Sequence, residues 1–319
     1  MSASPLRVAV VGVGQLGRHH ARLLVGLPDV DLVGVFDLNR QRAEEIAATV
    51  KTSVLTDLAA LPSLVDAVTI AVPTESHASV ALPLLERGVP VLVEKPLARS
   101  VEEADQLIAA AARGGATLAV GHTERFNPAV QAARALLHHP RFIEVHRLGT
   151  FSERSLDIDV VFDLMIHDLD VVLSVVESDV ESIDAVGVPV LTPKTDIANV
   201  RLRFRNGCIA NLTASRISRD RIRKIRFFQP DSYVSIDYAA QELETWKLVR
   251  PPAGIPSIEG GKQQVATDEP LKLELADFVD AVRHKREPGV TGAQGRRALA
   301  LAQQITRQMT MAGEAPAAR

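Results

Sequence analysis

The 319-residue sequence contains a single cysteine, Cys208, so no disulfide can form within the chain. No cluster of Cys and His residues has the spacing of a metal-binding motif, and we therefore expect no metal site. A chain that lacks both disulfides and metal clusters is typical of a reducing compartment. On this evidence we predict a cytoplasmic protein.

Long hydrophobic runs are also missing. The apolar run from Val8 to Val13 is too short for the core of a signal peptide, and no stretch approaches the roughly 20 apolar residues of a membrane span. The net charge is only -3, and aromatic residues make up 4% of the chain. Neither value favours a nucleic acid or a membrane as a partner, so we expect a small-molecule ligand.

The N-terminal third of the chain alternates short apolar runs with helical stretches. Runs of Val, Ile and Leu that are separated by helices predict a parallel sheet covered on both faces. We therefore predict a doubly wound α/β domain of the Rossmann type over residues 1–122. The predicted strands are Leu6–Val11, Val30–Phe36, Val68–Val72, Val89–Val93 and Ala116–Val120, and the predicted helices are Leu16–Leu27, Arg40–Ala48, Ser76–Arg87 and Val101–Ala112.

The pattern changes in the rest of the chain, and we predict a second, α+β domain over residues 123–319. Alternating polar and apolar residues from Val180 to Leu248 predict a large, mostly antiparallel sheet. The pair Asn206-Gly207 is typical of a type I′ hairpin turn, and Pro251–Gln264 is predicted to be a loop because it is rich in Gly and Pro. The predicted helices are Pro128–His138, Val160–Val176, Leu271–Arg283 and Gly292–Met309, of which the last can pack back on the first domain.

A glycine-rich turn, Gly12-Val13-Gly14-Gln15-Leu16-Gly17, follows the first predicted strand and opens the first helix. Gly12 permits a tight turn, Gly14 leaves room for a pyrophosphate, and Gly17 lets the helix pack closely on the strand. The start of the helix then offers free amides to phosphates. An ordinary turn without a nucleotide is the alternative, but the strand before and the helix after favour a dinucleotide.

Asp37 ends the second predicted strand, where a carboxylate accepts hydrogen bonds from the hydroxyls of the adenosine ribose. The same charge repels a 2′-phosphate, so we predict NAD rather than NADP. Arg40 and Arg42 lie close to Asp37 in the sequence and keep NADP open as the second choice.

Glu94-Lys95-Pro96 follows a buried strand of the predicted parallel sheet. The carboxyl ends of such strands line the ligand crevice, so the ammonium of Lys95 is well placed to hydrogen-bond a substrate hydroxyl beside a nicotinamide. The alternative is that Glu94 and Lys95 only pair with each other at the surface.

Asp163 and His167 are four residues apart in the apolar run Val160–Val176, so in a helix they share one face. Imidazole accepts a hydroxyl proton near neutral pH, and a carboxylate can orient it. We predict that His167 is a general base and that Asp163 orients it. A hydrogen-bonded core histidine is the alternative, and Asp168 and Asp170 receive no defined role.

Five segments, in this order and spacing, resemble the glucose-fructose oxidoreductase/inositol dehydrogenase (Gfo/Idh/MocA) family. They are the glycine-rich turn, Ala71-Val72-Pro73-Thr74 with His77, Glu94-Lys95-Pro96, Gly121–Pro128 and Asp163–Asp170. The resemblance implies NAD(P) in the first domain, a sugar or polyol at the sheet of the second, and chemistry by Lys95, Asp163 and His167. The cofactor-binding residues expected from it are Gly12, Gly14, Gln15, Leu16, Gly17, Asp37, Arg40, Pro73, Thr74, His77, Glu94 and Lys95; the expected substrate-binding residues are Lys95, His122, Arg125, Asn127, Asp163 and His167.

The segment from Arg201 to Arg226 carries nine basic residues against one acidic residue, Asp220. A solvated or subunit-facing sheet surface with acidic partners elsewhere is the first interpretation. The functional interpretation is anion recognition, because arginine forks suit phosphates, so the substrate can carry a diphosphate. Nucleic acid is a third option, which the few aromatic residues and the negative net charge do not favour. The stretch Ser215–Arg226 also resembles a branch of the family whose members oxidise the 3-hydroxyl of UDP-linked N-acetylglucosamine.

Other functions stay open at this point. The chain could oxidise a free polyol such as inositol, reduce a different ring system as a biliverdin reductase does, or bind NAD as a sensor without catalysis. The pair Asp163 and His167 favours a hydroxyl substrate and an enzyme. We also expect a homodimer or homotetramer, because a half-apolar sheet face rarely stays uncovered.

Overall fold

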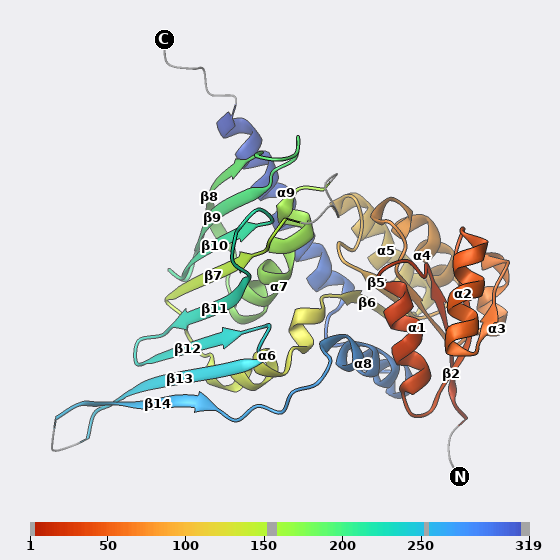
Figure 1. Cartoon of the computed structure of the whole chain (residues 1–319), viewed down its shortest axis with the longest axis horizontal. Coiled ribbons are helices and arrows are strands. Elements are labelled where there is room, and N and C mark those ends of the chain that lie inside the picture. Colours follow the sequence, from red (N-terminus) through yellow and green to blue (C-terminus); the bar gives the residue numbers. More distant parts are fainter. Residues whose placement is uncertain (1–3, 152–157, 252–254, 314–319) are drawn as a thin grey trace. The chain divides into compact units, whose positions relative to one another are not determined.

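The computed structural model describes residues 4–151, 158–251 and 255–313, and Figure 1 shows the whole chain. The chain divides into two compact units. The first comprises Met1–Thr123 together with Glu269–Leu299, and the second comprises Glu124–Asp268 together with Ala300–Arg319. The first unit thus contains a segment from near the C-terminus, which holds the predicted helix Leu271–Arg283 and the start of the predicted helix Gly292–Met309.

The first unit is built on a six-stranded parallel sheet with the order β3-β2-β1-β4-β5-β6, which is the doubly wound order of dinucleotide-binding domains. The predicted Rossmann fold is therefore confirmed. The strands are β1 (Leu6–Val11), β2 (Val30–Phe36), β3 (Ser53–Val54), β4 (Ala67–Ile70), β5 (Val91–Glu94) and β6 (Leu118–Gly121), and the longer helices are α1 (Gly17–Gly26), α2 (Arg40–Val50), α4 (His77–Glu86), α5 (Val101–Gly114) and α8 (Pro270–His284).

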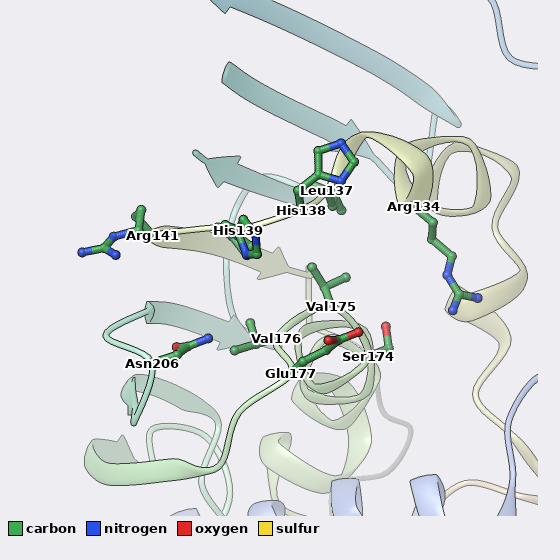
Figure 2. Close-up of a pocket in the computed structure, with 11 residues that line it drawn as sticks. Arg134, Leu137, His138, His139, Arg141, Ser174, Val175, Val176, Glu177 and Asn206 are labelled. Carbon is green, nitrogen blue, oxygen red and sulfur yellow. The ribbon is translucent and has the colours of Figure 1, made fainter. Parts of the chain in front are cut away.

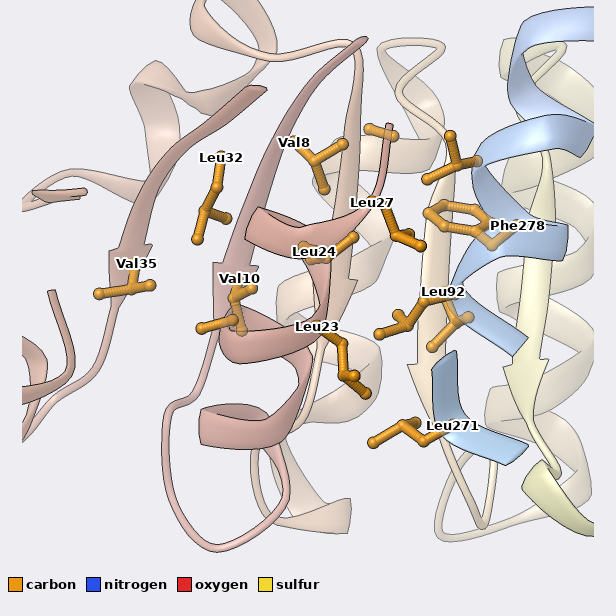
Figure 3. Packing of buried hydrophobic residues seen from close by; sticks show 14 of the residues in the cluster. Val8, Val10, Leu23, Leu24, Leu27, Leu32, Val35, Leu92, Leu271 and Phe278 are labelled. Carbon is orange, nitrogen blue, oxygen red and sulfur yellow. The ribbon is translucent and has the colours of Figure 1, made fainter. Parts of the chain in front are cut away.

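Helix α8 lies beside α1 and completes the apolar core on one side of this sheet (Figure 3). Leu24 of α1, Val10 of β1 and Phe278 of α8 are fully buried in one cluster. Burial of each such side chain stabilises the fold by about 1.5–3 kcal/mol. The helix that follows β1 is thereby fixed against the sheet at the point where the glycine-rich turn begins.

The second unit is built on an eight-stranded sheet with the order β14-β13-β12-β11-β7-β10-β9-β8. Only β7 and β10 pair in parallel, so the predicted, mostly antiparallel sheet is confirmed. The strands are β7 (Phe142–Leu148), β8 (Val180–Val188), β9 (Ile197–Phe204), β10 (Ile209–Ser215), β11 (Ile222–Phe228), β12 (Ser232–Asp237), β13 (Glu242–Val249) and β14 (Ser257–Gln263).

Two local predictions in this sheet are wrong. The expected loop contains β14, in which Gly260 comes so close to β13 that a Cβ there would lie 2.0 Å from the carbonyl oxygen of Thr245. Its glycines therefore mark close backbone approach within a strand. The β9–β10 turn is not type I′, because Gly207 has a φ of +85° but Asn206 has no positive φ. The amide of Gly207 donates to the carbonyl of Phe204 (2.9 Å), which closes a longer loop.

The predicted helix Val160–Val176 begins with a π-helical turn, Val161–Met165, and continues as α7 (Ile166–Val175). The turn packs against β10. The short helix α6 (Pro128–Ala133) precedes β7, and α9 (Gly292–Gly313) ends the described chain. None of the helices in the described ranges is both long and apolar enough to cross a membrane.

Candidate active site

The glycine-rich turn of the first unit has the shape that a dinucleotide requires. Gly12 has a φ of +85°, and its amide donates to the carbonyl of Phe36 (2.7 Å). A Cβ on Gly17 would lie 1.8 Å from the carbonyl oxygen of Gly12, whereas the only atom near a Cβ on Gly14 is Nη1 of Arg42, at 3.9 Å. Gly12 and Gly17 thus serve the turn itself, and Gly14 leaves the open space into which a pyrophosphate fits.

Gln15 and Leu16 lead into α1 and are exposed. No side chain caps the start of this helix. The first amides of a helix have no partner within the helix, and together with the helix dipole they favour an anion. The two residues therefore present backbone donors at the place where the phosphates of a dinucleotide are expected.

Asp37 follows β2 and is held beside the turn. Its Oδ2 accepts a hydrogen bond from the amide of Val13 (2.9 Å), and its Oδ1 accepts one from the amide of Asn39 (2.8 Å). Nη1 of Arg42 lies 3.6 Å from the same carboxylate. Arg40, by contrast, pairs with Glu44 on its own helix at 2.8 Å. The geometry thus brings Asp37 to the turn, while Arg40 extends along the surface of α2.

His77 follows the Pro73-Thr74 segment and was expected to contact the cofactor. It is buried, with Nδ1 2.9 Å from the carbonyl oxygen of Pro96 and Nε2 3.0 Å from that of Val72. Burial lowers the pKa of His77, and the two carbonyls oppose this shift. Both ring nitrogens face backbone carbonyls, so His77 connects the segments after β4 and β5, and its contact with the cofactor stays a prediction.

Glu94, at the end of β5, is enclosed by the protein. One carboxylate oxygen lies 3.0 Å from Nε2 of His20 on α1, and the other accepts from the backbone amide of Lys95 at 3.2 Å. A Cβ on Gly121 would lie 2.9 Å from this carboxylate, so the glycine makes room for it. Sequence reasoning missed His20, because only the packing of α1 against β5 brings it to Glu94. The pair fixes the strand end from which half-buried Lys95 projects.

In the second unit, Asp163 lies in the π-helical turn and His167 in the first turn of α7, and both are half-buried. The amide of Ile166 donates to the carbonyl of Val161, the i to i+5 bond that defines the wider turn. Turns of this kind are rare and frequently lie at functional sites. The amide of Asp163 also donates to the carbonyl of Asp159 (3.1 Å), which connects it to the segment before the turn.

Asp168, next to His167, anchors α7 to the sheet through a buried ion-pair network. Arg147 of β7 donates from Nε to Asp168 Oδ2 (2.6 Å) and from Nη2 to Asp168 Oδ1 (3.0 Å), and its Nη1 donates to Glu124 (3.0 Å). Burial disfavours the charged guanidinium, but the carboxylates of Asp168 and Glu124 outweigh it, so the pKa of Arg147 is raised. Burial and the charge of Asp168 also raise the pKa of Tyr238, whose ring lies 5.0 Å from the guanidinium.

Three expected substrate-binding residues have buried side chains. Arg125 is 3% exposed, with Nη1 3.6 Å from a carboxylate oxygen of Asp170. Asn127 accepts from the amide of Ala129 at the start of α6 and donates to the carbonyl of Tyr238 (3.0 Å). His122 is 1% exposed in the first unit. Their surroundings thus give Arg125 and Asn127 partners within the second unit, and direct contact with a substrate stays a prediction for all three.

The basic segment divides between the outward face of the sheet and its interior. Arg201 is exposed on β9 and donates to Asn211, and Arg226 lies in the same row of that face and pairs with Glu144 at 2.7 Å. Arg216 is buried 3.8 Å from Asp196. Recognition of a diphosphate by these strands stays a prediction, as does the alternative of a solvated or subunit-facing surface.

Comparison with known proteins identifies the family. A model described as an oxidoreductase family with an NAD-binding Rossmann fold matches residues 6–122, and a GFO/IDH/MocA C-terminal domain model matches residues 101–228. The chain is 40% identical to UDP-N-acetylglucosamine 3-dehydrogenase from Acidithiobacillus ferrooxidans over 94% of this chain and 96% of that one. It is 27% identical to scyllo-inositol 2-dehydrogenase (NAD(+)) from Bacillus subtilis over 90% and 89% of the two chains.

A solved structure of the Acidithiobacillus ferrooxidans enzyme superposes with a TM-score of 0.91 and 38% identity, covering 97% of this chain and 99% of that one. The fold, the glycine-rich turn and these similarities agree. The chain therefore belongs to the Gfo/Idh/MocA family of NAD-binding oxidoreductases.

Proposed function

We propose that this protein is an NAD-dependent dehydrogenase that oxidises the 3-hydroxyl of UDP-N-acetylglucosamine to a ketone. The observation that carries the proposal is the 40% identity, over nearly the whole of both chains, to an enzyme named for that reaction. The half-buried Lys95, Asp163 and His167 supply the chemistry that hydroxyl oxidation needs.

Three side chains have assigned roles in this proposal. His167 accepts the proton of the reacting hydroxyl, and Asp163 orients its imidazole. Lys95 hydrogen-bonds the substrate oxygen and stabilises the negative charge that develops there. The nicotinamide cofactor, when bound, accepts a hydride from the substrate carbon that carries the reacting hydroxyl. The Glu94–His20 pair has no direct contact with the substrate in this proposal; it positions Lys95 by holding the backbone that carries it.

The preference for NAD over NADP is part of the proposal. It is supported by the carboxylate of Asp37, which two backbone amides hold beside the glycine-rich turn. Arg42, 3.6 Å away, partly offsets that charge. Replacing Asp37 by Ser should therefore lower kcat/KM for NAD and narrow its advantage over NADP. An unchanged ratio of kcat/KM for NAD to kcat/KM for NADP would mean that other residues select the cofactor.

The decisive test is reduced-nicotinamide absorbance with a panel of substrates, in the presence of a carbonyl trap. We expect turnover with UDP-N-acetylglucosamine and NAD. Lys95→Met should abolish turnover but leave NAD affinity nearly unchanged, and the matched control Lys247→Met, at an exposed position of β13, should behave as the wild type. Turnover with free inositols alone would favour the polyol function, and NAD binding without any turnover would favour a sensor.

We further propose that copies of the chain associate in the cytoplasm through the outward face of the eight-stranded sheet. Phe142, Phe228 and Tyr233 form a row of rings there, with centroids 5.5 and 5.1 Å apart, and Trp246 on the next strand is 37% exposed. An exposed aromatic row of this kind is typical of a subunit contact. Light scattering should report a dimer or tetramer that Phe228→Asp weakens; a monomeric wild type would refute this.

A further inference from the structure

A pocket of about 680 Å³ lies in the second unit, in a region to which the proposed function assigns no role (Figure 2). One wall is the segment from Arg134 to Arg141, between α6 and β7. The facing wall is the end of α7, from Ser174 to Glu177, and Asn206 of the β9–β10 loop closes one side. The volume is within the range of roughly 300–1,000 Å³ that small-molecule sites occupy.

The two walls carry opposite charge. All the basic side chains, Arg134, His138, His139 and Arg141, belong to the first wall, whereas Glu177 and the carbonyl end of α7 belong to the second. Figure 2 shows the histidines on one side of the pocket and Glu177 on the other. A ligand that complements such a pocket carries an anionic group at one end and hydrogen-bond donors at the other.

Among the described residues, the arginines and the glutamate of the pocket do not stabilise the fold through ion pairs. Within the described ranges, neither Arg134 nor Arg141 forms an ion pair, and Glu177 forms none either. Other exposed arginines form ion pairs; Arg113, for example, pairs with Glu86 at 3.1 Å. An unpaired guanidinium group at the edge of a concave surface raises the local positive potential and suits the oxygens of a phosphate.

The second wall offers partners for hydroxyl groups. The carboxylate of Glu177 accepts hydrogen bonds from vicinal hydroxyls, as the acidic residue of a dinucleotide site does from ribose. Ser174 donates its own hydroxyl to the carbonyl of Val171 (2.7 Å), which leaves its oxygen as an acceptor. The side-chain oxygen of Asn206 accepts from the amide of Cys208 (3.0 Å), so its amide nitrogen can donate.

From this polarity we propose that the pocket binds a phosphorylated sugar. Its phosphate lies on the basic wall, at the guanidinium of Arg134 or of Arg141, which Figure 2 shows at opposite ends of that wall, and its sugar hydroxyls lie on Glu177. The same chemistry occurs in a free sugar phosphate and in a ribonucleotide. The site is separate from the predicted catalytic pair, because it lies at the last turn of α7 whereas His167 lies at the first, about 10 Å away along the helix axis.

Isothermal titration of the full-length protein, saturated with NAD to fill the dinucleotide site, tests the proposal. Glucose 6-phosphate should bind, glucose should not, and inorganic phosphate should bind roughly tenfold more weakly because it has no hydroxyls for Glu177. Adenosine monophosphate serves as the ribonucleotide probe, and whichever of the two phosphorylated probes binds more tightly identifies the source.

Variants locate the binding. The double variant Arg134→Ala with Arg141→Ala should weaken glucose 6-phosphate binding by roughly tenfold or more, since it removes the charge-assisted hydrogen bonds to the phosphate at either end of the basic wall. Glu177→Ala should remove the advantage of glucose 6-phosphate over inorganic phosphate. The control Arg113→Ala, also exposed, should change nothing. Unchanged affinity in the double variant, or no binding of either phosphorylated probe at millimolar concentration, would overturn the proposal.

Discussion

Replacing Asp168 by Asn tests the buried network that anchors α7. The substitution removes the negative charge of Asp168 and turns one of the two oxygens that accept from Arg147 into an NH2 donor, which leaves Glu124 as the remaining carboxylate beside the guanidinium. Arg147 and Asp168 are 4% and 1% exposed, so water cannot replace the lost partner. Removing one member of a buried pair costs about 3–5 kcal/mol. In a unit of this size that corresponds to a fall in Tm of roughly 6–20 °C.

The single tryptophan, Trp246, lies on β13, so its fluorescence reports unfolding of the second unit. The matched control is Glu144→Gln on the same strand β7, whose pair with Arg226 is about one-third exposed and contributes less than about 1 kcal/mol. The double variant Arg147→Met with Asp168→Asn should be less destabilised than the sum of the single variants. A loss for Asp168→Asn no larger than that of Glu144→Gln would refute the reasoning.

Three further predictions follow from local geometry. Gly17→Ala should disrupt the turn and lower Tm, because its Cβ meets the carbonyl of Gly12, whereas Gly14→Ala should keep Tm and lose NAD affinity by titration; equal effects on Tm would contradict this. Burial opposes ionisation of Asp196, but the amides of Leu191, Thr192 and Val190 lower its pKa from 3.8 to about 2. The ionised carboxylate therefore contributes about 2 kcal/mol to the free energy of unfolding. This contribution is complete above pH 4 and is lost as the pH falls from about 4 to 2. Acid unfolding of Asp196→Asn should lack that step, and a persisting step would assign it to another group. Burial raises the pKa of Cys208 to about 11, so the native thiol should stay unreactive towards iodoacetamide at pH 8 and react once the protein is unfolded; rapid native alkylation would contradict its burial.

The fold class could be predicted from the sequence because it depends on local periodicity. Buried runs of Val, Ile and Leu between helices indicate a parallel sheet, and alternation after Val180 indicates an antiparallel one. The glycine-rich turn and Asp37 were also predictable, because the strand and helix on either side of the turn place them. Glycine occurs both in loops and in strands whose backbones approach closely, so composition alone wrongly predicted a loop where β14 forms.

The partners of charged and polar side chains were decided by the tertiary structure. His20 and Glu94 are 74 residues apart, and Arg147 and Asp168 are on different elements, so no local pattern signals either pair. For His77, packing turned both ring nitrogens towards backbone carbonyls, which the sequence did not signal. Local sequence determines which face of an element is apolar, whereas the partner of a buried charge depends on which distant strand or helix packs against it.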